Sequence, residues 1–255
     1  MRTAVRTFSL LLVCFVLACS DDPVSQHALP TTPGHPDAIA LNREADEAAL
    51  WLSGELTSPG ALYTTIASDL AAIRAQYSTA VPAVAVEFTA WWLPSELIVY
   101  VNDDLKQKIL THQATPLDEM NSAMGAAEVD SRRLAVGKNY VFIYFVGRKH
   151  PQRLAEQYMS VAGVTGAYPD GWIGDRPNVY PWYIPDGMSY LVRDAFDDCP
   201  AGCIENIFHY FKRVNGQTEY VGSYHLAAQP EPAWWAEAKV PFYVYLGGQD
   251  PRTFH

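Results

Sequence analysis

The 255-residue chain lacks the short motifs by which common catalytic sites are recognised. It has no Gly-x-Ser-x-Gly elbow, no His-Glu-x-x-His zinc helix, no phosphate-cradling glycine loop and no dinucleotide fingerprint. We therefore expect no cofactor and no metal. The sequence favours a binding protein over an enzyme, although it leaves the question of catalysis open.

Positive charge is also scarce. The chain has 18 Lys and Arg against 28 Asp and Glu, for a formal net charge of −10. This balance argues against nucleic acid and against docking on an anionic bilayer. Charged residues make up only 18% of the chain, whereas 7 Trp and 15 Tyr are present. Such a composition is typical of a β-rich exported protein.

No apolar run is long enough to cross a bilayer. The longest, residues 8–18, has about half the length that a membrane-spanning helix needs. Because Arg2 and Arg6 precede it, the segment has the order of a secretory signal. We expect residues 1–18 to be a signal peptide.

The signal ends in Val-Leu-Ala-Cys-Ser, residues 16–20, which resembles the lipobox of bacterial lipoproteins. The resemblance implies cleavage before Cys19 and a lipid on its thiol, so the membrane itself would be a partner. Ser20 implies the outer membrane if the host is Gram-negative. The body would then lie in the cell envelope, outside the cytoplasm. Cleavage after Ser20, with simple secretion, is the alternative.

Residues 19–36 form the expected lipidated tether. The segment is rich in Pro, Ser and Thr and has almost no large apolar residue, so it should stay extended. Three regions follow in our division of the chain. They are a helical segment, a ferredoxin-like α+β region and an antiparallel β region, at residues 37–80, 81–169 and 170–255.

The remaining cysteines indicate one disulfide. Cys14 leaves with the signal, and Cys199 and Cys203 stand in Asp-Cys-Pro-Ala-Gly-Cys-Ile. In an oxidising compartment such a pair favours a structural disulfide over a redox pair or a zinc site. The motif also resembles one found in bacterial lipoproteins without an established activity. The resemblance supports the same envelope location.

The first two regions are predicted from periodicity. Helices are expected over residues 37–56 and 59–77, the second with apolar residues every three or four positions. Residues 84–88 alternate like a strand. From residue 96 to 169 the order is strand, helix, strand, strand, helix, strand. The two middle strands are placed at residues 132–136 and 140–146.

That order is the split βαβ, ferredoxin-like arrangement, with helices on one face of an antiparallel sheet. Residues 140–146 are apolar on both faces, which predicts a central strand covered on both sides. The end of the region resembles the end of subtilase propeptides, which act as chaperones and inhibitors of their proteases. The residues that carry this resemblance are Leu154, Tyr158, Val161, Gly163, Val164, Ala167 and Pro169.

The last region is predicted to be a three-stranded meander over residues 188–195, 204–214 and 217–225. Its Asn215-Gly216 turn is a strong hairpin signal. The turn would place Lys212 opposite Glu219 and His225 opposite Asn206. His225 would then lie on the other sheet face from His209, so the two would not share a metal.

The best binding candidates lie around the disulfide. Trp172 and Trp182 offer aromatic platforms for a sugar or a peptide. Asp194, Asp197 and Asp198 could bind Ca²⁺ or act as an acid/base pair, but a charged loop tip is the favoured interpretation.

Three hypotheses of function follow from these observations. The first is a non-catalytic envelope lipoprotein with a binding surface for an envelope protein, a peptide or a glycan. The second is a peptidase-inhibitor module like the propeptides. The third is an extracytoplasmic hydrolase that uses the three aspartates.

Overall fold

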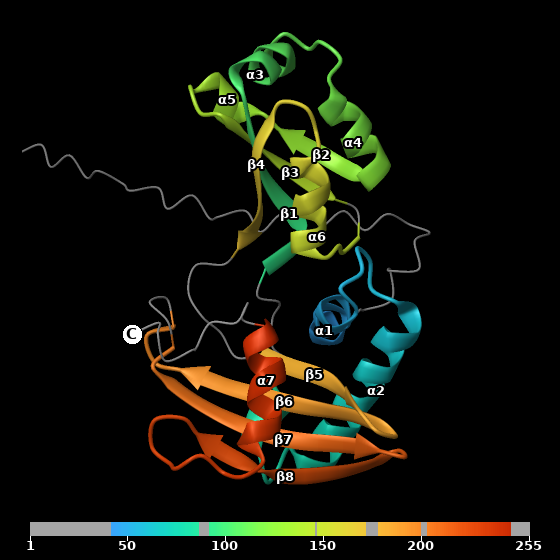
Figure 1. Ribbon diagram of the computed structural model, residues 1–255, viewed down its shortest axis with the longest axis vertical. Helices are drawn as coiled ribbons and strands as arrows, with labels where there is room; N and C mark the ends of the chain where they lie inside the picture. The colour runs from blue at the N-terminus through green and yellow to red at the C-terminus, as the bar shows by residue number, and fades with distance from the viewer. Residues whose placement is uncertain (1–41, 87–91, 146, 172–177, 200–202, 246–255) are drawn as a thin grey trace, which may run out of the picture.

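The computed structural model describes residues 42–86, 92–145, 147–171, 178–199 and 203–245 (Figure 1). The expected signal peptide and tether lie outside these residues. The described part is α+β, as predicted, with seven α-helices and two antiparallel sheets. The first helices are α1 (Arg43–Ser53) and α2 (Gly60–Tyr77), followed by the 3-10 helix η2 (Pro82–Ala85).

The first sheet has the ferredoxin-like order β2-β3-β1-β4. Every neighbouring pair of strands is antiparallel. The sequence of elements that builds it is β1 (Trp92–Val101), α3 (Asp103–Leu110), α4 (Pro116–Met124), β2 (Ala126–Asp130), α5 (Arg132–Ala135), β3 (Tyr140–Phe145), α6 (Pro151–Met159) and β4 (Val164–Gly171). The predicted split βαβ arrangement is confirmed.

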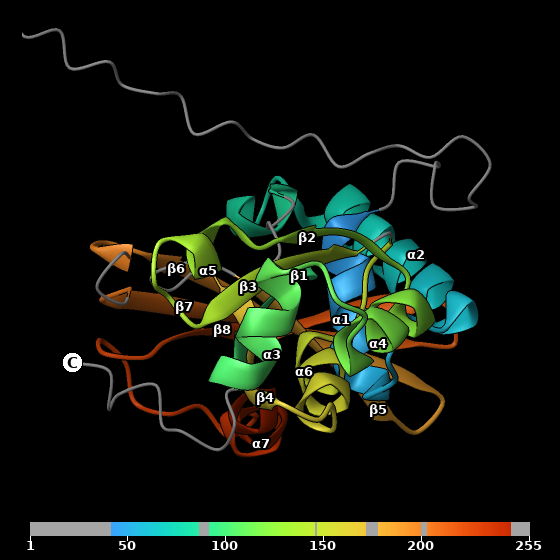
Figure 2. The same cartoon turned by 90° about the horizontal axis from the view of Figure 1, so that it is seen from above.

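Within the described ranges, helices cover one face of this sheet and not the other. Seen from above, α3, α4 and α6 lie on the same side of β1 and β3 (Figure 2). Alternate strand residues such as Val99 and Ile143 point to that side and are fully buried. Tyr158 of α6 joins this core and donates a hydrogen bond to Asn121 Oδ1 of α4 at 2.8 Å. The prediction that β3 is covered on both faces is therefore wrong.

One strand of the first sheet was predicted at the wrong place. The strand lies at Ala126–Asp130, and residues 132–135 form α5 instead. The carboxylate of Asp130 explains the change, since Oδ1 accepts from the backbone N–H of Arg132 at 2.9 Å. This local turn ends the strand at Asp130, before the predicted range of 132–136.

The second sheet is a meander of order β5-β6-β7-β8 with helices on both faces. Figure 1 shows α7 crossing one face, with α1 and α2 on the other side. Its elements are β5 (Asn178–Ile184), β6 (Gly187–Phe196), β7 (Glu205–Val214), β8 (Gln217–His225) and α7 (Trp235–Tyr245).

Each face of the second sheet has its own core. Ile66, Leu70 and Ile73 of α2 pack with sheet residues that include Tyr190 and Phe211. On the opposite face Trp235, Ala238 and Phe242 of α7 pack with a second set, Tyr180, Leu191, Phe208, Tyr210 and Tyr224. The helices before the first sheet thus share a core with strands that follow it.

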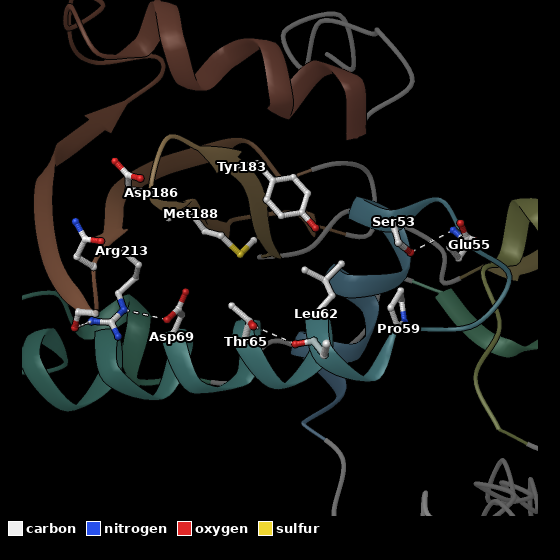
Figure 3. Close-up of a pocket in the computed structure, with 14 residues that line it drawn as sticks. Ser53, Glu55, Pro59, Leu62, Thr65, Asp69, Tyr183, Asp186, Met188 and Arg213 are labelled. Atoms are coloured by element: carbon white, nitrogen blue, oxygen red, sulfur yellow. Dashed lines mark hydrogen bonds and ion pairs between the residues drawn. The ribbon is translucent and has the colours of Figure 1, made fainter.

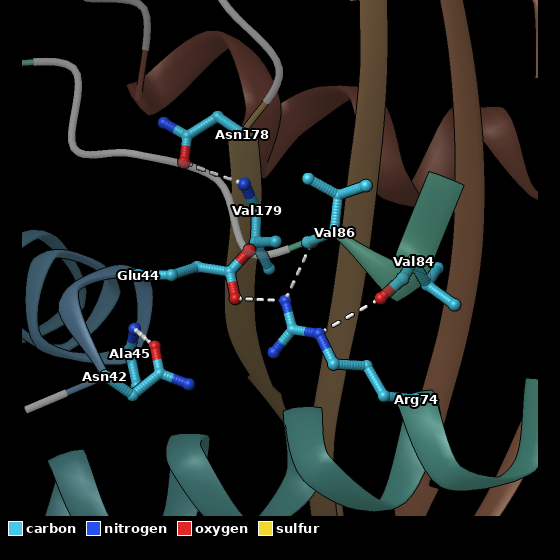
Figure 4. A network of polar contacts seen from close by, with 8 residues as sticks. All are labelled: Asn42, Glu44, Ala45, Arg74, Val84, Val86, Asn178 and Val179. Carbon is cyan, nitrogen blue, oxygen red and sulfur yellow. Dashed lines mark hydrogen bonds and ion pairs between the residues drawn. The ribbon is translucent and has the colours of Figure 1, made fainter. Parts of the chain in front are cut away.

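A half-buried arginine, Arg74, contacts the segment that leads to the first sheet (Figure 4). Arg74 of α2 pairs with Glu44 of α1 and donates to the carbonyls of Val84 at 3.0 Å and Val86 at 3.2 Å. Pro82 opens η2 here, so the strand expected at residues 84–88 is wrong for its described part. Phe88 lies outside the described residues.

Two elements of the second sheet were not predicted. β5 contains Pro181, which is tolerated because β5 is an edge strand. α7 contains Pro241 and is apolar on more than one side: Trp235 is fully buried, whereas Val244 is 73% exposed. Neither segment has the clean periodicity from which an element is predicted.

The Asn215-Gly216 turn sets the register as predicted, with Lys212 opposite Glu219. A register shift between Tyr210 and Phe211 then moves the rest of β8 by one residue. His225 lies opposite Ile207 rather than Asn206, so it shares a sheet face with His209. The predicted separation of the two histidines on opposite faces is wrong.

Candidate functional site

The predicted binding residues that the structure describes are spread over different places in the fold. Trp182 stacks on Tyr210 beneath α7, with ring centroids 5.4 Å apart and planes inclined by 19°. It lies opposite Ser189 of β6, five residues before Asp194. That spacing is roughly 16 Å, and the odd offset puts Asp194 on the other sheet face.

The two remaining aspartates lie beyond the end of β6. Asp197 and Asp198 are exposed and adopt left-handed backbone conformations, with φ of 60° and 46°. The disulfide between Cys199 and Cys203 closes the connection to β7, and Cys203 is buried. Trp172 and Cys19 lie outside the described residues.

One face of the first sheet has no described helix over it, and we call it the open face. Its aromatic and apolar side chains come from β1, β3 and β4, and none belongs to a buried core cluster of the described chain. They are Ile98, Tyr100, Tyr140, Phe142, Tyr144 and Tyr168. Four acids complete the open face: Glu96, Glu128, Asp130 and Asp170.

The aromatic end of the open face is a chain of ring contacts. Tyr100 meets Tyr140 at 5.3 Å and Tyr168 at 5.8 Å, the latter edge-on at 86°. Tyr140 meets Phe142 edge-on at 5.5 Å. The ring of Tyr168 lies over Gly166, where an added Cβ would come within 2.9 Å of it. Tyr168 is nevertheless 58% exposed, so its outer ring face is open to solvent.

At the acidic end, the carboxyl groups of Glu96 and Asp170 are hydrogen-bonded to each other. Burial and the charge of Asp170 raise the pKa of Glu96 from 4.5 to about 7. Burial also raises the pKa of Asp170, while the hydrogen bond from Glu96 lowers it. Tyr144 donates to Glu96, and burial together with that neighbouring charge raises the pKa of Tyr144 to about 12.

At the edge of the open face, Asp130 is the one of these four acids that forms an ion pair with a described residue. Arg132 donates to both carboxylate oxygens of Asp130, at 2.9 and 2.7 Å. This contact lowers the pKa of Asp130, which therefore stays ionised. Its charge is balanced locally, whereas the shared charge of Glu96 and Asp170 is not paired with Arg132.

A cavity of about 720 Å³ lies between α2 and the β5–β6 turn (Figure 3). Its strongest polar groups already satisfy one another. Asp69 accepts from Arg213 at 3.0 Å and from Tyr190 at 2.7 Å. Arg213 also donates to Gly216 O and Thr218 Oγ1. A ligand would have to compete with these contacts, so the open face is the better candidate site.

The histidines of the second sheet offer no shared site. Burial lowers the pKa of His209 to about 4, and its ring contacts the hydroxyl of Tyr220 at 3.2 Å. His225 contacts Glu205 instead. Among the described residues no group of three or more His, Cys, Asp or Glu side chains is arranged to hold a metal ion.

Sequence reasoning missed the open face although its signal was present. Tyr140, Phe142 and Tyr144 alternate with the buried Val141 and Ile143. We interpreted this run as burial on both sides, because aromatic side chains suit a core as well as a surface. The acids are far apart in sequence, and only the sheet order brings Glu96 beside Asp170.

None of the described helices combines the length and hydrophobicity that crossing a bilayer requires. Comparisons with protein-family models, with curated proteins and with solved structures find no match to this chain.

Proposed function

We propose that the protein is a non-catalytic lipoprotein of the bacterial envelope that binds a ligand on its open face. The observation that carries the proposal is a row of aromatic rings beside a carboxyl pair, on a sheet face without a described helix over it. Rings left in water contribute little to folding, whereas exposed aromatic patches commonly serve as binding sites. Tyr168 at 58% exposure is the clearest case.

The anchor is supported by the sequence alone. Arg2 and Arg6, the apolar run and Cys19 have the order of a lipoprotein signal, and a proline-rich tether follows. Mass spectrometry of the mature N-terminus tests this part. A diacylglycerol on Cys19 is expected, and an unmodified chain that starts at Asp21 would leave only secretion.

Binding is tested with immobilised peptide and glycan libraries. A ligand of the open face should lose affinity for Tyr168→Ala and for Gly166→Ala, which displaces the Tyr168 ring. The control is Tyr183→Ala, an equally exposed tyrosine of the second sheet at 63%. Equal binding by all four proteins would contradict the proposal.

The same libraries test the absence of catalysis. Two carboxyl groups that share a proton can serve as an acid/base pair, as in aspartic proteases. Hydrolysis of a library member that disappears in Glu96→Gln or Asp197→Ala would replace the binding proposal with a hydrolase.

A peptidase-inhibitor module is the second candidate, favoured by the ferredoxin-like order of the first sheet. Of the residues that carry the propeptide resemblance, Leu154, Tyr158, Val161 and Ala167 are buried in its core. The resemblance at these positions therefore indicates a similar fold and gives no evidence of a surface that contacts a protease. Inhibition of a panel of subtilases at micromolar concentration is the test, and its failure removes this candidate.

A further inference from the structure

The open face has more negative than positive charge. Its four acids come from β1, β2 and β4, and the described cations near them are Arg132, which pairs with Asp130, and Arg133, whose charge also acts on Asp130. Arg132 is held by Asp130, although its side chain remains 83% exposed. No ion pair within the described part of the chain includes Glu128, Glu96 or Asp170, so their charge is available to a partner. Charge complementarity favours a positively charged ligand.

The carboxyl pair of Glu96 and Asp170 suits a cationic ligand. Glu96 and Asp170 are half-buried, lie beside each other on neighbouring strands and are hydrogen-bonded, which requires a proton on one of them. An ammonium or guanidinium group donates several hydrogen bonds and can contact both carboxylates at once. When it does so, the shared proton leaves to solvent and the N–H groups of the cation take its place.

The rings beside the pair suit the same ligand. Cations bind over the faces of tyrosine rings, and guanidinium groups also stack on them. The ring of Tyr168 rests on Gly166 and exposes its outer face. Tyr100 is 39% exposed and packs edge-on against the Tyr168 ring, so both rings belong to the same exposed surface. The apolar stems of long basic side chains can pack there.

We propose, building on the proposed function, that the open face docks a basic polypeptide segment. A lysine or arginine side chain lies between Glu96 and Asp170, and the neighbouring residues of the segment lie across Tyr168 and Tyr100.

Other ligand classes fit this surface less well. Nucleic acids and anionic lipids would meet the acids of the open face with like charge. Calcium takes six to eight oxygen ligands, more than the carboxyl pair supplies. A neutral glycan can stack on the rings but leaves the acids without a counter-charge. An amine-bearing glycan shares the cation but remains a separate possibility, which the experiment distinguishes.

The experiment uses calorimetry on the full chain, purified in a non-ionic detergent. The probes are an alternating arginine–glycine peptide and the same peptide with neutral citrulline in place of arginine. Titrations at pH 6 in two buffers of different ionisation heat measure proton release. We expect the arginine peptide to bind about tenfold or more tightly than its neutral form. We also expect close to one proton to be released per peptide.

Four variants localise the effect. Glu96→Gln keeps the shape of the side chain and a hydrogen bond to Asp170 but removes the ionisable group. Proton release on binding should therefore vanish, and the affinity for the arginine peptide should fall about tenfold. Gly166→Ala should weaken binding by displacing the Tyr168 ring. Glu119→Gln, an exposed acid on α4, and Tyr183→Ala on β5 are matched controls and should bind normally.

Each result decides one of the two proposals. Equal affinity of Glu96→Gln and the unaltered chain for the arginine peptide would overturn this inference. A second outcome would also overturn it but leave the proposed binding function intact. In that outcome the protein binds a glucosamine oligomer or a neutral glycan, loses this binding in Gly166→Ala and does not bind the arginine peptide. If no probe or library ligand responds to Gly166→Ala or Tyr168→Ala, both proposals fail.

Discussion

The two sheets of the molecule use similar side chains in different surroundings. Tyr190 and Tyr210 of the second sheet are fully buried under α2 and α7. Tyr100 and Tyr168 of the first sheet are 39% and 58% exposed, because helices cover only the opposite face. Residue type alone therefore does not say whether a strand is covered. Coverage depends on which helices pack against each face.

The comparison also separates stability from binding. Rings in the second sheet are removed from water on folding and stabilise it by the apolar area that they bury. Rings on the open face gain much less in this way. Substitutions in the two sheets should accordingly differ in their effect on unfolding, and the predictions below run from the largest effect to the smallest.

Trp235→Ala should be the most damaging change. Trp235 is fully buried and contacts Phe208 and Phe242. Removing a buried tryptophan leaves a cavity and typically costs about 3–5 kcal/mol of unfolding free energy. Urea unfolding followed by circular dichroism measures it. Val244→Ala on the exposed side of α7 is the control. Equal losses for both would mean that α7 does not cover the second sheet.

Opening the disulfide should have an intermediate effect. Replacing Cys199 and Cys203 by serine frees a very short loop, so the loop-closure account gives about 2 kcal/mol. Guanidinium unfolding of the double variant measures the change, and reduction of the unaltered chain should reproduce it. A variant as stable as the oxidised chain would show that the β6–β7 connection holds its shape without the bond.

The open face should make stability depend on pH in an unusual direction. Glu96 keeps its proton up to about pH 7 when folded but loses it near pH 4.5 when unfolded. The unfolded state therefore binds fewer protons in this window, and the melting temperature should fall as the pH rises through it. Asp170, whose pKa burial also raises, adds to the same trend.

Glu96→Gln tests this pH dependence. The variant should flatten the slope of melting temperature against pH between about 4.5 and 7, and Glu119→Gln should leave it unchanged. Tyr144 donates to Glu96, and the charges of Glu128, Asp130 and Arg132 act on Tyr144, with Arg133 near Asp130; all of them remain in both variants. An unchanged slope in Glu96→Gln would show that the proton is not held there.

Tyr168→Ala should have the smallest effect on stability. The ring is mostly exposed, so its loss should change the unfolding free energy by about 0.5 kcal/mol or less. Tyr183→Ala on the second sheet should behave alike, since it is 63% exposed. Urea unfolding checks both. A loss above about 2 kcal/mol for Tyr168 alone would mean that the open face is part of a core.

Local patterns in the sequence predict much of the fold. The order of elements in the first sheet and the Asn215-Gly216 register follow from periodicity and turn chemistry. Longer-range features do not. The bulge at Tyr210 that moves His225 coincides with Gly222, which lies under the indole of Trp234. Such a contact depends on where α7 packs, and no local pattern contains it.

The candidate site was harder to predict than the fold. Trp182 and the aspartates near the disulfide were chosen because they are close in sequence, but alternation along β6 separates Trp182 from Asp194. Glu96 and Asp170 are far apart in sequence and adjacent in the sheet. The predicted ferredoxin-like order already sets β1 beside β4, but the register that makes these two residues neighbours includes an irregularity between Trp92 and Leu97 that no local pattern contains.

The shared core of the N-terminal helices and the second sheet has a consequence for folding. Asp69 of α2 is paired with Arg213 of β7, 144 positions later. When a chain emerges N-terminus first, the first sheet can close once residue 171 is free. The apolar faces of α1 and α2 must wait for β5 to β7. Contacts of such long sequence separation slow folding. The ferredoxin-like unit should therefore be the earlier folding nucleus, with the helices docking last.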